Sequence, residues 1–119
     1  MKLFFAGLIS ISFLFQSVAQ TPQKHNYTLA KDVLWASPEG VDLTMDIYTP
    51  NTGKASYPVL IIYHGGGWLI NTNDIMDQPS DYLASRGEYV VCNVNYRLLV
   101  DQNNSVNLNQ IVEDALGAL

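Results

Sequence analysis

The chain has 119 residues, of which 48% are hydrophobic and 14% charged, and its formal net charge at pH 7 is -5. This composition is that of an ordinary globular protein and not of a disordered chain. The acidic balance argues against nucleic acid as a partner, because binding to phosphates requires a basic patch.

Residues 1–19 are predicted to be a secretory signal peptide. A positively charged start precedes an apolar run of 13 residues, and Ser17 and Ala19 are small residues at the cleavage site. The run is too short for an ordinary membrane span. We therefore expect a secreted or periplasmic protein that starts at Gln20 and has no stable membrane anchor; an uncleaved anchor is the alternative.

Two strands are predicted next, over residues 27–36 and 41–49, with the turn "SPEG" between them. Together they would form an antiparallel hairpin. The second strand alternates strictly: one side carries Val41, Leu43, Met45 and Ile47, and the other carries Asp42, Thr44 and Asp46. This alternation predicts a strand with one solvated face.

The following strand, in "YPVLIIYH", has no alternation, because residues 59–63 are all apolar or aromatic. Such a run is typical of a parallel strand covered on both faces, and residues 88–96 have the same character. A short helix is predicted between them, over residues 77–87, with Asp77 as its N-cap and Gly87 at its C-terminal end.

A second amphipathic helix is predicted over residues 107–119. Asn107 and Gln110 have the spacing of a capping box. The predicted apolar stripe consists of Leu108, Ile111, Val112, Ala115, Leu116 and Leu119. No proline and no cationic residue stand in the last turn before Leu119, so we expect this stripe to pack onto further protein.

No metal or cofactor is expected. Cys92 is the single cysteine, so an internal disulfide is excluded, and we expect a buried, inert thiol. His25 and His64 lie far apart in the sequence, without cysteine or carboxylate neighbours at the spacing of metal ligands.

The order of elements predicts an α/β fold with an antiparallel edge. Directly after the strand of residues 59–63 comes "HGGGW", at the end of the strand where open α/β sheets bind ligands. Glycine has a high entropic cost of ordering, so three in a row indicate either a flexible turn or a place where bare backbone is needed.

These motifs resemble the N-terminal third of an α/β-hydrolase. The similarity rests on "VLIIYHGGGW", "YLASRGEYVVCNVNYRL" and "EDALGAL", and it runs from about Leu34 to Leu119. It is strongest to esterases of the hormone-sensitive-lipase type and to secreted feruloyl and acetylxylan esterases. The segment "LTMDIYTP" also resembles the second strand of the feruloyl and acetylxylan esterases. Residues 20–119 are thus identified as the N-terminal portion of such a domain. The family's strand order implies that residues 59–63 form an open edge.

The resemblance implies a role for the glycine loop. Backbone N–H groups of such a loop stabilise the anionic oxygen that forms during acyl transfer. In this family the donors correspond to Gly66 and Gly67, and Trp68 would wall the substrate pocket, with a place in the core as the alternative. His64 is expected to fix the loop by hydrogen bonding and not to be catalytic, because the triad histidine follows the nucleophile in these enzymes.

Arg97 and Asp114 match family positions that the resemblance marks as structural. We expect them to pair and to hold the exit of the second parallel strand to the last helix; two separately solvated charges are the alternative. The chain departs from the family in "LINTND" after Trp68, where relatives often carry a glycine.

No G-x-S-x-G nucleophile motif occurs in the 119 residues. The expected function is therefore that of a larger secreted serine esterase, in which this chain carries the oxyanion loop and is inactive alone. Its substrate would be a small-molecule or polysaccharide-linked ester. A non-catalytic binding protein and a peptidase of the same fold remain the alternatives.

Overall fold

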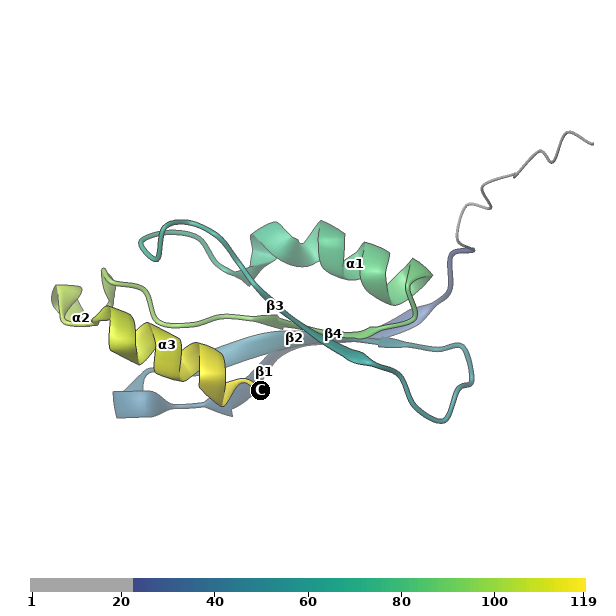
Figure 1. Cartoon of the computed structure of the whole chain (residues 1–119), viewed down its shortest axis with the longest axis horizontal. Coiled ribbons are helices and arrows are strands. Elements are labelled where there is room, and N and C mark those ends of the chain that lie inside the picture. The colour runs from purple at the N-terminus through teal and green to yellow at the C-terminus, as the bar shows by residue number, and fades with distance from the viewer. Residues whose placement is uncertain (1–22) are drawn as a thin grey trace, which may run out of the picture.

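The computed structural model describes residues 23–119 (Figure 1). The predicted signal peptide, residues 1–19, lies outside this range. Among the described helices, none is long and apolar enough to cross a membrane.

Four strands form one mixed sheet. They are β1 (Tyr27–Ala36), β2 (Leu43–Pro50), β3 (Val59–Tyr63) and β4 (Val90–Val94), in the order β1-β2-β4-β3. β1 pairs with β2 and β2 with β4 in antiparallel fashion, whereas β3 and β4 are parallel. The predicted hairpin, the parallel pair and the position of β3 at an edge are therefore confirmed.

Helices cover both faces of this sheet (Figure 1). α1 (Asp77–Arg86) lies on one face, and α3 (Leu108–Gly117) lies on the other. Three short helical segments complete the described chain: η1 (Pro38–Gly40), η2 (Asn73–Met76) and α2 (Asp101–Asn104). The fold is the α/β arrangement that the sequence predicted.

Two small apolar clusters form the core, one under each main helix. On the α1 side, Ala84 packs with Tyr48 of β2 and Val91 of β4. On the α3 side, Ile111 packs with Tyr96 and Val106. Apolar side chains thus hold α1 to the sheet and α3 to the chain that follows β4.

The predicted solvated face of β2 is wrong at Asp46, whose side chain is buried. A bulge in β1 explains this burial, because the Asp32 backbone N–H and the Lys31 side chain face the carboxylate there. The Asp32 N–H donates to Asp46 Oδ1 over 2.8 Å, and Lys31 Nζ lies 3.5 Å from Asp46 Oδ2. Alternation in the sequence shows which residues are polar, but it does not show whether a polar side chain is bound by other protein groups or by water.

The prediction that β3 is covered on both faces is also wrong within the described chain. β3 is half-buried, and its first residue, Val59, is exposed. The reason is its place at the edge, where only β4 pairs with it. β4 lies between β2 and β3, and accordingly most of its residues are buried.

The ends of the two main helices differ in how well they were predicted. Asp77 is the first residue of α1 and not its N-cap, because η2 runs directly into the helix. The Asp77 carboxylate instead accepts a 3.0 Å hydrogen bond from the Tyr48 hydroxyl. The capping box of α3 is confirmed, with Asn107 and Gln110 making both reciprocal bonds.

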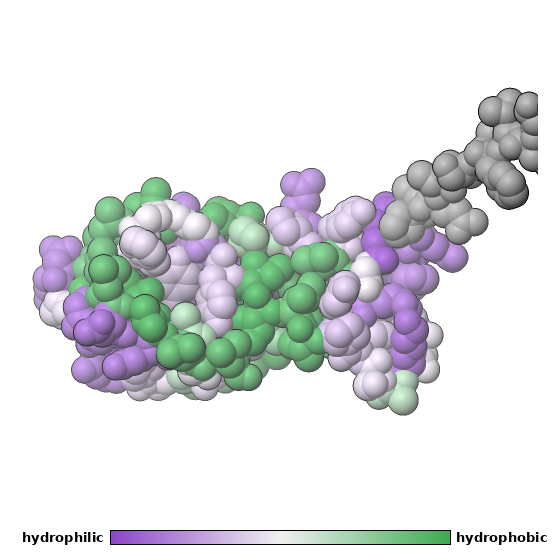
Figure 2. Space-filling model, viewed as in Figure 1, coloured by the Kyte–Doolittle hydropathy of each residue, from purple (hydrophilic) through white to green (hydrophobic). Residues whose placement is uncertain are grey.

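The apolar stripe of α3 is only partly buried. Ile111 packs into the core, but four members of the predicted stripe are exposed: Leu108, Val112, Leu116 and Leu119. Figure 2 shows hydrophobic surface over the half of this face that carries α3 and the loop after β3, continuing toward the middle of the molecule.

Candidate active site

The loop after β3 has a backbone that only glycine adopts readily. Gly66 has φ of 135° and Gly67 has φ of 63°. A Cβ on Gly66 would lie 2.2 Å from the carbonyl oxygen of Ile70, whereas a Cβ on Gly67 would meet nothing within 4 Å. Gly66 is therefore required for both conformation and space, and Gly67 for conformation alone.

The two amides predicted to bind an oxyanion are available for a ligand. Within residues 23–119, no hydrogen-bond acceptor meets the N–H of Gly66 or of Gly67. The carbonyl of Gly66 accepts a 3.2 Å bond from the Leu69 N–H, which closes a tight turn. Donor groups of this kind, fixed by a turn and free of protein acceptors, can bind an anionic oxygen.

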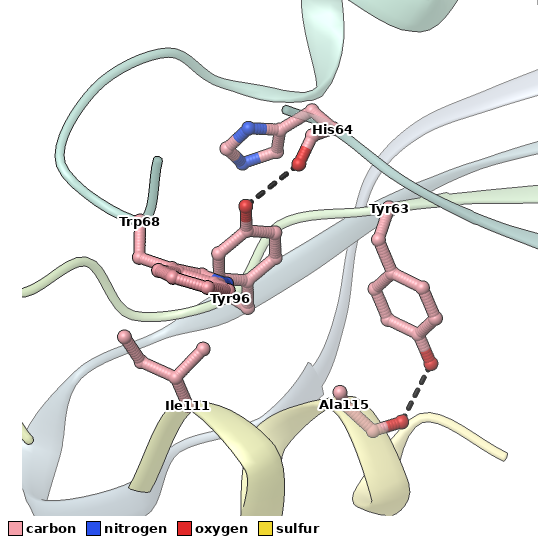
Figure 3. Close-up of a pocket in the computed structure, with 6 residues that line it drawn as sticks. All are labelled: Tyr63, His64, Trp68, Tyr96, Ile111 and Ala115. Carbon is pink, nitrogen blue, oxygen red and sulfur yellow. Dashed lines mark hydrogen bonds between the residues drawn. The ribbon is translucent and has the colours of Figure 1, made fainter. Parts of the chain in front are cut away.

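His64 supports this loop, as predicted, and its side chain is buried. Its ring stacks on the ring of Tyr96, with centroids 4.4 Å apart and an interplanar angle of 13°. The Tyr96 hydroxyl donates to the His64 carbonyl over 2.6 Å (Figure 3). His64 Nδ1 lies 3.0 Å from the carbonyl oxygen of Gly65. The imidazole is thus occupied in holding the loop.

A pocket of about 250 Å³ opens beside the loop. Its lining is aromatic and apolar, and comes from Tyr63, His64, Trp68, Tyr96, Ile111 and Ala115 (Figure 3). The Tyr63 hydroxyl donates to the Ala115 carbonyl over 2.5 Å, which links β3 to α3. Burial raises the pKa of both Tyr63 and Tyr96 above the ordinary tyrosine value.

Trp68 lies at the wall of this pocket and not in the core, since it is 52% exposed. Its backbone has a φ of 63°, an unusual conformation for a bulky residue. Its carbonyl accepts a 2.8 Å bond from the Leu99 N–H, which ties the glycine loop to the chain after β4. Trp68 thus lines a pocket beside the glycine loop and is not a core residue, and its contact with substrate stays a prediction.

The predicted pair of Arg97 and Asp114 is confirmed. Both side chains are buried, and Arg97 Nη2 lies 2.7 Å from Asp114 Oδ1. Arg97 Nε and its backbone N–H donate to Asp114 Oδ2 over 2.9 and 3.0 Å. Glu39 adds a further contact to Arg97 Nη1 at 2.8 Å. The network joins the exit of β4 to α3 and η1.

Sequence reasoning missed two residues that contact the glycine loop, Tyr96 and Asn71. Tyr96 follows β4 and directly precedes Arg97, so the buried ion pair fixes its position. Asn71 Nδ2 donates to the Gly65 carbonyl over 3.2 Å. Neither contact has a local sequence signal, because each joins residues through the folded loop.

The described residues contain no group of three or more side chains able to hold a metal ion. Cys92 lies in β4 and is half-buried, and burial raises the pKa of its thiol. A thiol in this state is a poor nucleophile.

Comparison with solved structures identifies the fold. An esterase from the Planctomycetes species Thermogutta terrifontis superposes with a TM-score of 0.64 and 24% identity, covering 80% of this chain and 32% of that one. The mixed sheet with a helix on each face is therefore that of an α/β-hydrolase.

The family follows from sequence. The profile of the BD-FAE family matches residues 45–116, well over half of the chain, and the chain belongs to this family. It is 39% identical over 56 residues to phenmedipham hydrolase of Pseudarthrobacter oxydans, covering 47% of this chain and 11% of that one. It is 33% identical over 57 residues to carboxylesterase NlhH of Mycobacterium tuberculosis, covering 48% and 18%. The chain thus spans between a tenth and a fifth of these relatives.

Proposed function

We propose that this chain forms the oxyanion-loop part of a carboxylic ester hydrolase that works through an acyl-enzyme. The observation that carries the proposal is the glycine loop, in which the amides of Gly66 and Gly67 lack acceptors among the described residues. Membership of an esterase-type family supports the reaction class.

The proposed chemistry divides between this chain and the rest of the protein. A serine attacks the ester carbonyl, and the oxygen of the tetrahedral intermediate takes up negative charge. The amides of Gly66 and Gly67 donate to that oxygen, together with the amide that follows the nucleophile. The 119 residues contain no G-x-S-x-G motif, so in this proposal the serine, its acid and its histidine belong to another part of the protein.

The pocket favours an apolar or aromatic group on the ester. Trp68 and Tyr63 present aromatic surface, and Ile111 and Ala115 close the pocket from α3. Stacking on such surfaces adds to the free energy gained by burying apolar area. Acetyl and feruloyl esters linked to polysaccharide are the substrates we propose.

The test is ester hydrolysis by the natural protein that contains this chain. We expect turnover of p-nitrophenyl acetate and methyl ferulate, and stoichiometric inactivation by an organophosphate that labels one serine. The isolated 119-residue chain should show no serine-dependent turnover. Binding of ester without turnover would favour a non-catalytic protein, and cleavage of peptides in preference to esters would favour a peptidase.

We further propose that the protein is exported, on the basis of the sequence pattern in residues 1–19. N-terminal sequencing of protein recovered from the periplasm or the medium should begin at Gln20. Recovery of Met1 from that material would contradict cleavage at this position.

A further inference from the structure

The carbonyl oxygen of Gly65 is held by two side chains from opposite ends of the glycine loop. His64 Nδ1 lies 3.0 Å from this oxygen, and the amide of Asn71 donates to it over 3.2 Å. The histidine donates in the tautomer that carries its proton on Nδ1.

The orientation of the Gly65 carbonyl determines the orientation of the Gly66 N–H donor. The peptide bond between Gly65 and Gly66 is planar and trans, so its C=O and the N–H of Gly66 point in opposite directions. Hydrogen bonds that fix the Gly65 oxygen therefore fix the direction of the Gly66 N–H. Glycines on both sides would otherwise let this peptide plane rotate at little cost.

Asn71 is placed for this contact by its own backbone. It has φ of 81°, in the left-handed region that asparagine tolerates better than most residues. The loop is closed tightly at this point, since a Cβ on Gly66 would lie 2.9 Å from Asn71 Nδ2. The left-handed backbone of Asn71 thus places its side-chain amide against the Gly65 carbonyl.

We propose that Asn71 is a positioning residue, which aims the Gly66 amide at the oxyanion by holding the Gly65 carbonyl. The inference rests on the proposed function, and it adds to it a residue that contacts neither the substrate nor the reacting atoms. His64 is its partner on the same oxygen.

The test compares two asparagine-to-glycine substitutions in the natural protein. Asn71→Gly keeps the left-handed backbone and removes the amide. Asn103→Gly, at an exposed residue with φ of 58°, makes the same chemical change away from the pocket. For Asn71→Gly we expect a three- to tenfold lower kcat, about the effect of one neutral hydrogen bond, with KM unchanged. Asn103→Gly should leave both constants unchanged.

A second readout does not use activity. In protein labelled with carbon-13 at the Gly65 carbonyl, Asn71→Gly should move this resonance upfield, and Asn103→Gly should not. Asn71→Asp, which replaces the donor by an acceptor, should move it as well. An unchanged resonance would overturn the contact, and an unchanged kcat with a shifted resonance would overturn its role in catalysis. If the wild-type protein hydrolyses no ester, the proposed function fails, and the resonance alone decides whether Asn71 holds the loop.

Discussion

At the scale of single residues, the glycine loop shows how a local sequence pattern can specify a backbone conformation. Three glycines in a row predict a special backbone, and Gly66 and Gly67 do have positive φ. The contacts that orient the loop could not be predicted, because Tyr96 and Asn71 reach it only in the folded chain. The glycine pattern predicts the backbone conformation of the loop, whereas the orientation of the loop depends on tertiary contacts.

Trp68 is the residue whose role in binding can be separated from any role in stability. It is half-exposed at the pocket wall, so Trp68→Ala removes contact area for a ligand and little of the core. We expect KM for methyl ferulate to rise about fivefold, in line with the roughly 1 kcal/mol of an aromatic pair, with a smaller change for p-nitrophenyl acetate. The melting temperature should stay within about 2 °C of the wild type.

Michaelis constants for the two esters and a thermal melt are sufficient for this test. Tyr96→Ala provides the contrast, because Tyr96 is buried in the α3 cluster and its loss should lower the melting temperature clearly. A large loss of stability in Trp68→Ala would show that the tryptophan is a core residue after all.

At the scale of elements, patterns with a local cause were predicted well, and burial was not. The capping box of α3 was predicted because Asn107 and Gln110 contact only their own helix end. The burial of Asp46 was missed because it depends on a bulge in a different strand. The half-burial of β3 was missed because an apolar sequence does not reveal whether other elements cover both faces of a strand.

Among the contacts between elements, we expect the pair of Arg97 and Asp114 to contribute strongly to the stability of the fold. Asp114→Ala would leave the Arg97 guanidinium buried without its main partner. Removing one member of a buried ion pair costs about 3–5 kcal/mol, and we expect a loss of that size in the free energy of unfolding. Glu39→Gln, at the exposed end of the same network, should cost far less.

Chemical denaturation of the two variants measures this difference. If Asp114→Ala unfolds at the same denaturant concentration as Glu39→Gln, the pair does not hold α3 to the sheet. In that case, the ion pair would also not explain why Tyr96 is held against the His64 ring.

At the scale of the whole molecule, apolar surface and an unpaired strand edge coincide. β3 has a partner on one side, and Leu116 of α3 and Leu119 beyond the end of this helix are exposed. Exposed strand edges are templates for pairing with other chains. Apolar side chains left in water also withhold about 1.5–3 kcal/mol each from a domain that is stable by about 5–15 kcal/mol.

We therefore expect purified residues 20–119 to self-associate and to unfold with weak cooperativity. Val59→Lys places a charge on the exposed start of β3 and should shift the chain toward monomer. Light scattering coupled to size exclusion and a urea titration test both points. A monomeric wild-type chain with a sharp unfolding transition would contradict the expectation.

The central claim is that backbone N–H groups of the glycine loop bind the oxyanion, and a single-atom replacement tests it. Glycolic acid in place of Gly66 or Gly67 exchanges the N–H for an oxygen and adds no side chain. We predict that each replacement lowers kcat by about 100- to 1000-fold, with KM and the melting temperature little changed. The same replacement at Gly53, an exposed glycine with φ of 80°, should leave kcat unchanged. Wild-type kcat in both loop replacements would contradict the assignment.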